Sequence, residues 1–134
     1  MTVFDVDVVA VVIAAISSFA LGGIWYSPLL FHKPWLEEAG LTELDIQNAD
    51  HKLVFSGAMF LSILAALLMA ALLGKSPAIV DGVLLGLAVG VCFVASTLGT
   101  SYLFEQRPLK LFLINAGYHT AQFCLIGFML AILS

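Results

Sequence analysis

This sequence contains very little charge. Of its 134 residues, only 10% are Asp, Glu, Lys or Arg, and 62% are hydrophobic. A soluble domain has about 25% charged residues, which cover its surface in water. The composition therefore excludes an ordinary soluble domain and predicts an integral membrane protein whose main partner is the lipid bilayer.

Basic residues and paired cysteines are also scarce. Five Lys and Arg residues stand against nine Asp and Glu residues, which leaves a net charge of −4 and no basic surface for binding nucleic acid. The two cysteines, Cys92 and Cys124, lie in apolar runs without Cys-x-x-Cys spacing. This spacing indicates neither a zinc site nor a disulfide framework. We expect no metal and no cofactor.

Four long runs contain no charged residue, at positions 8–26, 53–74, 82–104 and 111–134. Each has the length of about 18–25 residues that a helix needs to cross a hydrocarbon core of about 30 Å. The runs are continuous rather than alternating, which favours helices over a barrel. We expect an all-α membrane protein with one domain over residues 1–134. Its bundle of four transmembrane helices is expected at about 7–26, 53–74, 79–104 and 110–133.

The connection between the first two spans is long enough to have structure of its own. Pro28 and Pro34 interrupt any continuing helix, so we expect the chain to turn along the membrane interface. Thr42 and Asp45 have the spacing of a capping box, which predicts the start of a short helix. The connection is therefore expected to be interfacial and partly helical.

Basic residues are distributed unevenly between the two sides of the membrane. Lys33, Lys52, Arg107 and Lys110 lie in or beside the connections 27–52 and 105–110, whereas the other side has only Lys75. The positive-inside rule places these two connections in the cytoplasm and both termini outside. An interfacial motif of Trp25, Tyr26, Pro28 and Trp35 lies at the same boundary, where amphipathic rings are favoured.

Small residues recur at every fourth position in three of the spans. They are Ala10, Ala14, Ser18 and Gly22 in the first span, Ala58, Ser62, Ala66, Ala70 and Gly74 in the second, and Gly82, Gly86 and Gly90 in the third. Positions four apart share a helix face, and small side chains allow close approach of backbones in lipid. These ladders pack helices within one bundle or between copies. We expect the glycine ladder to be the first choice for self-association.

Uncharged polar residues form one stripe on the fourth span. Asn115, Tyr118, His119 and Gln122 share a helix face, and Ser96, Thr97, Thr100 and Ser101 precede them in the third span. We expect the two groups to lie opposite each other at the same depth. His119 is the one ionisable residue at that depth, which makes it a candidate functional residue. The stripe forms either a hydrogen-bonded seam or the lining of a cavity for a small solute.

Two motifs carry a resemblance to a known family. Residues 22–28 read Gly-Gly-Ile-Trp-Tyr-Ser-Pro, and residues 109–119 read Leu-Lys-Leu-Phe-Leu-Ile-Asn-Ala-Gly-Tyr-His. With Lys33, Trp35 and the sequence Gly-Leu-Thr-Glu at 40–43, they resemble the domain of unknown function 1761 family of small bacterial membrane proteins. The resemblance implies four transmembrane helices and the bacterial inner (cytoplasmic) membrane. The family has no established activity, so the resemblance implies no mechanism.

Two functions fit these features. The first is a homo-oligomer whose intramembrane polar cavity binds or conducts a small solute. The alternative is a non-catalytic accessory or scaffold subunit of a larger membrane complex. We do not expect an enzyme, because the sequence contains neither a Gly-x-Ser-x-Gly nor a His-Glu-x-x-His motif.

Overall fold

A computed structural model describes residues 6–134, which form helices joined by short connections and contain no strand. In chain order the helices are α1 (Val8–Trp25), α2 (His32–Ala39), α3 (Glu43–Gln47), α4 (His51–Leu73), α5 (Ile79–Val89), the π-helical segment η1 (Gly90–Ala95), α6 (Ser96–Glu105) and α7 (Leu109–Leu133). Helix α5, η1 and α6 follow one another without a break, so they form one long helix.

Within the described residues, four helices are long and apolar enough to cross a membrane: Val8–Trp25, His51–Leu73, Ile79–Glu105 and Leu109–Leu133. Their ends lie close to those expected from the uncharged runs. The all-α membrane fold is therefore confirmed. The last of the four is the least apolar, because it carries the polar stripe.

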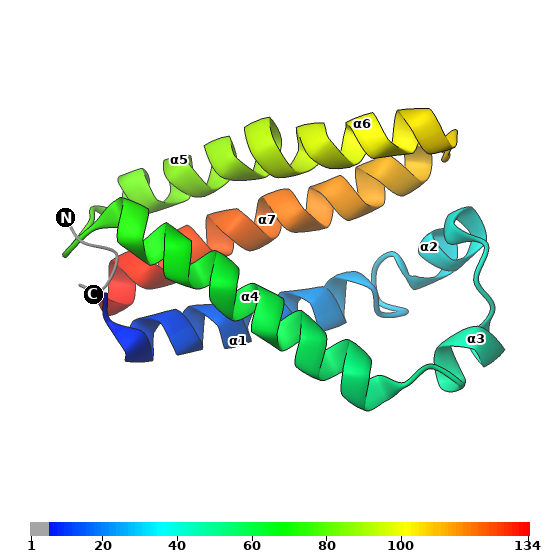
Figure 1. The fold of residues 1–134 in the computed structure, drawn as a ribbon, viewed down its shortest axis with the longest axis horizontal. Helices are drawn as coiled ribbons and strands as arrows, with labels where there is room; N and C mark the ends of the chain where they lie inside the picture. Colours follow the sequence, from blue (N-terminus) through cyan, green and yellow to red (C-terminus); the bar gives the residue numbers. More distant parts are fainter. Residues whose placement is uncertain (1–5) are drawn as a thin grey trace.

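Helix α7 lies in the middle of the bundle (Figure 1), where it packs against α1 on one side and against α5 and η1 on the other. Helix α4 crosses α1 at an angle, and its beginning diverges from α7 toward α3. Helix α1 begins and α7 ends at one end of the bundle, while α2, α3 and the α6–α7 turn lie at the other. The connections 27–52 and 105–110 thus share one side, as expected; which side is cytoplasmic stays a prediction.

Short-range hydrogen bonds fix the starts of the helices. The carboxylate of Asp7 accepts from the Ala10 N–H at the start of α1. At α3, Thr42 Oγ1 accepts from the Asp45 N–H, and the Asp45 carboxylate accepts from the Thr42 N–H. This reciprocal pair satisfies two backbone donors that have no partner inside the helix. The short helix expected after Thr42 is confirmed.

The glycine ladder of the third span packs inside the chain. A Cβ atom at Gly86 would lie 2.2 Å from the Phe123 carbonyl oxygen, and one at Gly82 would lie 2.3 Å from that of Gly127. Helices α5 and α7 therefore touch through their backbones, which only glycine permits at these positions. The face that we expected to self-associate is thus covered by α7, and its partner Gly127 was not foreseen.

The small-residue ladders of α1 and α4 are buried over most of their length, whereas Ala58, at the beginning of the α4 ladder, is exposed. The core joins one side of α1, the second half of α4 and the end of α7; its buried residues are Ala10, Val11, Ala14, Ala15, Ala66, Met69, Ile126 and Leu130. All of them lie in the half of the bundle where α1 begins and α7 ends (Figure 1). The polar stripe occupies the other half of α7.

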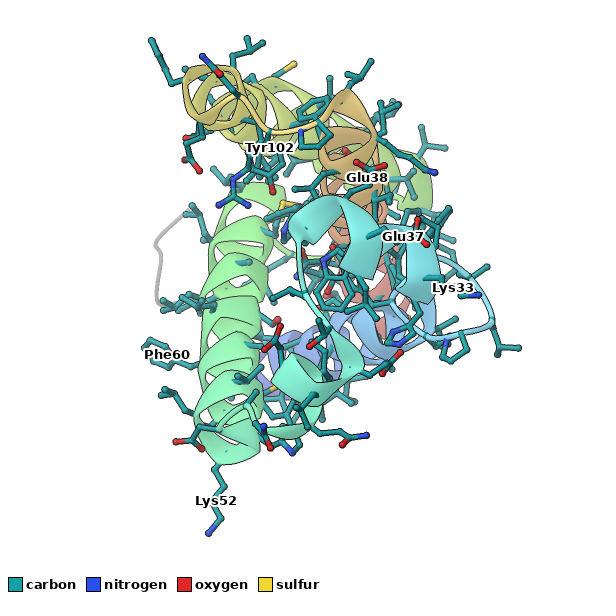
Figure 2. The ribbon with its side chains drawn as sticks, turned by 90° about the vertical axis from the view of Figure 1, so that its right-hand side faces the viewer. Lys33, Glu37, Glu38, Lys52, Phe60 and Tyr102 are labelled. Atoms are coloured by element: carbon teal, nitrogen blue, oxygen red, sulfur yellow. The ribbon has the colours of Figure 1, made fainter. Side chains whose placement is uncertain are left out.

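Large apolar side chains cover the outside of the bundle. Phe60 projects from α4 away from the other helices (Figure 2), and it is 61% exposed. Leu103 and Phe104 at the end of α6 are exposed too. Such a surface is stable against lipid and not against water, which agrees with the membrane assignment.

Candidate functional site

One amide joins three helices in the half of the bundle that carries the polar stripe. Tyr26 Oη donates to Asn115 Oδ1 over 2.6 Å, and Asn115 Nδ2 donates to Tyr102 Oη over 2.8 Å. Tyr26 follows the last residue of α1, Tyr102 belongs to α6 and Asn115 to α7. Because amide and hydroxyl groups in lipid are stabilised mainly by each other, Asn115 fixes the positions of all three elements.

Two further hydrogen bonds join α1 and α7, each from a side chain of one helix to a backbone carbonyl of the other. Trp25 Nε1 donates to the Ile114 carbonyl oxygen over 3.0 Å. Tyr118 Oη donates to the Ser18 carbonyl oxygen, also over 3.0 Å. We refer to the five side chains of Trp25, Tyr26, Tyr102, Asn115 and Tyr118 as the polar seam.

Glycines make room for the rings of the polar seam. A Cβ atom at Gly22 would lie 2.9 Å from Tyr118 Oη, and one at Gly117 would lie 3.1 Å from Trp25 Cζ2. Each ring therefore lies against the backbone of the opposite helix. The glycine of each sequence motif thus makes room for an aromatic ring of the other motif.

The rings also pack against one another. The ring centroid of Tyr26 is 4.9 Å from that of Trp35 and 5.5 Å from that of Tyr118. The Trp25 and Phe31 ring centroids are 5.0 Å apart. Contacts of this kind contribute about 0.5–1.5 kcal/mol each beyond the area they bury. They hold α2 against the end of α1 and against α7.

The residues Trp25, Tyr26 and Trp35, which we expected to be interfacial anchors, thus lie between helices. Pro28 is exposed in the turn that separates α1 from α2.

The polar seam is satisfied within the chain. Among residues 6–134, no buried side-chain nitrogen or oxygen atom lacks a hydrogen-bond partner. The structure thus shows Asn115 and Tyr118 in a closed hydrogen-bonded arrangement. These two residues fasten α7 to α1 and α6.

His119 differs from its neighbours in the stripe. Its Nδ1 atom is 2.8 Å from Gln122 Oε1, and Gln122 is only 6% exposed. Because an amide oxygen accepts and cannot donate, Nδ1 carries the proton of the neutral ring and Nε2 keeps its lone pair. Among the described residues, no hydrogen bond involves Nε2, and His119 as a whole is only partly buried.

His119 also lies well inside the membrane-spanning part of α7. It follows Lys110 by nine residues, which corresponds to about 13 Å along a helix that rises 1.5 Å per residue. Its ring is half-buried and contacts the ring of Tyr118, with centroids 4.9 Å apart. The site therefore combines the buried amide of Gln122 with a ring nitrogen that has no hydrogen-bond partner among the described residues.

The hydroxyls of the third span do not face α7. Ser96 Oγ donates to the Cys92 carbonyl oxygen over 2.6 Å, and Thr100 Oγ1 donates to that of Ser96 over 2.9 Å. Thr97 bonds in the same way to the Phe93 carbonyl oxygen, and Ser101, like the other three, is exposed. Of the residues in α6, Tyr102 is the one that reaches the polar seam.

The physical reason for this difference is the π-helical segment Gly90–Ala95. A π-helical turn contains an extra residue and therefore rotates everything after it relative to a regular α-helix. The rotation turns the four hydroxyls outward, where they satisfy themselves on their own helix. The pattern of residues alone did not indicate this segment.

Two other features of the described residues bear on the chemistry. A cavity of about 330 Å³ opens at the end where α1 begins, lined in part by Asp7, Lys75 and Leu130. None of the expected site residues lines it. Within residues 6–134, no group of three or more His, Cys, Asp or Glu side chains is placed to hold a metal ion.

Comparison with known proteins agrees with the resemblance seen in the motifs. Residues 9–131 match the family described as "Protein of unknown function (DUF1761)". The chain belongs to this family, since the match covers nearly all of it. Neither a curated protein nor a solved structure matches the chain significantly.

Proposed function

We propose that this membrane protein binds a small polar solute at the face of α7 that carries His119. The observation that supports the proposal is the Nε2 atom of His119, which has no hydrogen-bond partner among the described residues while Gln122 orients the ring at membrane depth. Ionisable residues are costly at such depth and are commonly retained for function. A lone pair on Nε2 accepts a hydrogen bond, so the solute is a donor such as ammonium, water or a small alcohol.

His119 lies seven residues, about two turns, before Ile126, so it shares the face of α7 that packs toward α4. Helix α4 packs against α7 through Ala66 and Met69, which contact the core around Ile126 and Leu130. The first part of α4 diverges from α7 (Figure 1), and its residues 51–56 are all exposed. A solute reaches His119 from this side, and a second copy of the chain covering it would complete the lining of a conducting path. Self-association is therefore part of the proposal.

Flux into liposomes tests conduction. Vesicles with a trapped pH indicator report entry of protons and ammonium, and light scattering reports entry of glycerol. We expect flux of at least one of these probes, and at least tenfold less in His119→Ala. His51→Ala is the matched control, because His51 is exposed at the start of α4 and bonds only to the Ile46 carbonyl oxygen.

Binding without conduction is tested separately. The ring resonances of His119 in the detergent-solubilised protein are followed while ammonium or glycerol is added. We expect a saturable shift that is absent for His51. Absence of both flux and a saturable shift with every probe would contradict the proposal.

A second candidate function is favoured by the polar seam itself. Every polar atom of Asn115 and Tyr118 that is buried has a partner inside the chain, as in a protein whose role is to hold a fixed shape. The exposed hydroxyl face of α6, with Ser96, Thr97 and Thr100, offers a surface for a larger membrane complex. Purification in mild detergent from native membranes separates the two functions. Isolation of a homo-oligomer without other subunits would contradict the accessory role.

We further propose that the protein resides in a bacterial inner membrane with both termini outside. The support is the excess of basic residues in the connections 27–52 and 105–110. In a variant without Cys92 and Cys124, single cysteines introduced by Asn48→Cys and Ser76→Cys are treated with an impermeant maleimide on intact spheroplasts. We expect labelling at position 76 and none at position 48 until the membrane is permeabilised. The reverse pattern would invert the topology.

A further inference from the structure

An apolar groove lies between α2 and the start of α7. Its volume is about 320 Å³, and it is lined by Phe31, Pro34, Lys110, Leu113 and Ile114. Four of these five side chains are apolar, and Leu113 is 59% exposed. Lys110 is the second residue of α7, so the groove lies where the helix enters the membrane.

Lys110 brings a positive charge to the rim of this groove. Lys110 forms no ion pair within residues 6–134, unlike His32, which pairs with Glu43, and Arg107, which pairs with Glu105. The N-terminus of α7 has no side-chain cap, so its first N–H groups and the helix dipole add to the positive potential. This end of α7 therefore attracts an anion.

Lys33 supplies a second cation on the α2 side. It lies between the groove residues Phe31 and Pro34 in sequence, and it is exposed and without an ion pair in the described part of the chain. Glu37, one turn further along α2, is also exposed and does not pair with it. Lys33 projects to one side of the bundle, far from Lys52 at the start of α4 (Figure 2).

The groove has apolar walls and lysines at its rim, so a ligand that uses both must have an apolar part and an anionic part. A free anion would use the lysines and leave the apolar walls unoccupied, whereas a neutral lipid would use only the walls. An anionic phospholipid has a phosphate at the membrane boundary and an acyl chain directly below it. Basic pockets beside membrane-spanning helices hold such lipids in this way.

We infer that the groove between α2 and α7 binds an anionic phospholipid. Its phosphate lies between Lys110 and Lys33 at the uncapped start of α7. One acyl chain follows Leu113 and Ile114 into the groove and contacts Phe31. The site is separate from His119, and it does not depend on the proposed solute.

Trp25 offers a built-in reporter for this site. Its ring centroid is 5.0 Å from that of Phe31, which lines the groove. The chain has two tryptophans, so Trp35→Phe leaves Trp25 as the single emitter and keeps an aromatic ring against Tyr26. Bromine atoms on an acyl chain quench tryptophan emission only at short range.

The experiment compares two brominated lipids at equal mole fraction in phosphatidylcholine vesicles. We expect brominated phosphatidylglycerol to quench Trp25 at least threefold more than brominated phosphatidylcholine. Lys110→Gln brings the ratio close to one, and Lys33→Gln lowers it. Lys52→Gln removes the same charge at the same side of the membrane, and it leaves the ratio unchanged.

Three outcomes would overturn the inference. Equal quenching by the two lipids in the parent protein would show that the groove does not select charge. A loss in Lys52→Gln equal to that in Lys110→Gln would show a general surface effect. Loss of the preference on addition of millimolar inorganic phosphate would show a site for a free anion and not for a lipid.

Discussion

The two halves of α7 associate with their neighbours in different ways. Near its end, α7 lies against α5 backbone to backbone, with Gly82 and Gly86 opposite Gly127 and Phe123. Near its start, hydrogen bonds and rings of the polar seam join it to α1 and α6. Lipid provides no hydrophobic driving force between helices, so close packing and hydrogen bonding are the remaining attractions. Helix α7 is held by close packing near its end and by hydrogen bonds near its start.

This difference separates a rigid part from an adaptable part. Where backbones touch, any added atom meets a group that cannot move. In the polar seam, the contacts are made by the ends of tyrosine, tryptophan and asparagine side chains, which can shift. His119, the proposed solute site, lies in the half of α7 that the polar seam holds together. The predictions below concern the free energy of unfolding in detergent and test this contrast.

The largest effect is expected from Gly86→Ala. The added Cβ would lie 2.2 Å from the Phe123 carbonyl oxygen and 2.8 Å from Cys124 Cα. Both atoms belong to the backbone, so α5 and α7 must separate. We expect a loss of about 3 kcal/mol in the free energy of unfolding, at the upper end of overpacking costs. Equilibrium unfolding followed by circular dichroism measures it.

Gly57→Ala is the matched control for this change. Gly57 lies in α4, and a Cβ atom there has nothing within 4 Å. Alanine favours the helix by up to about 1 kcal/mol over glycine, so the control is expected to be neutral or stabilising. Equal losses in the two variants would show that the backbone contact between α5 and α7 does not limit stability.

The next largest effect is expected from Asn115→Leu, which removes the bridge between Tyr26 and Tyr102. Two hydrogen bonds are lost, and the two hydroxyls remain without their partner. Hydrogen bonds between helices in lipid average about 0.6 kcal/mol, so we expect a loss of about 1–2 kcal/mol. Unfolding of Tyr26→Phe and Tyr102→Phe, each of which removes one of the two bonds, should account for most of it. A loss below 0.5 kcal/mol would contradict the bridging role.

The two halves of α7 also show which features of the structure can be predicted from the sequence. The uncharged runs predict the four spans, since a helix of that length must cross the membrane and its charges must lie outside. Thr42 and Asp45 predict the capping box, because both partners are close in sequence. The spacing of Asn115 and His119 predicts that they share a face of α7.

The choice of partner helix is what the sequence leaves open. A ladder of glycines shows that a backbone will come close, but Gly86 is equally suited to α7 and to a second copy. The stripe on α7 was expected to meet the hydroxyls of Thr97 and Thr100, and it meets Tyr26 and Trp25 instead. The outward turn of those hydroxyls depends on η1, and no residue type is specific for a π-helical turn.

A smaller effect is expected when the substitution made at Gly86 is repeated in the polar seam. At Gly22, the added Cβ would lie 2.9 Å from Tyr118 Oη, which is the end of a side chain. The ring can turn away and give up its hydrogen bond to the Ser18 carbonyl oxygen. We expect a loss below about 1 kcal/mol, because one hydrogen bond in lipid contributes about 0.6 kcal/mol. A loss as large as that of Gly86→Ala would show that both halves are equally rigid.

The smallest effect is expected from Thr100→Val, which tests whether polar residues in the membrane stabilise only when they join helices. Thr100 Oγ1 donates to the Ser96 carbonyl oxygen of its own helix, and the side chain is exposed. That carbonyl remains available to the backbone, and valine leaves no unpaired hydroxyl in lipid. We expect a change within about 0.5 kcal/mol, the range of surface substitutions that break no special contact. A loss approaching that of Asn115→Leu would mean that the outward hydroxyls of α6 face a partner, because only burial makes such a group costly to remove.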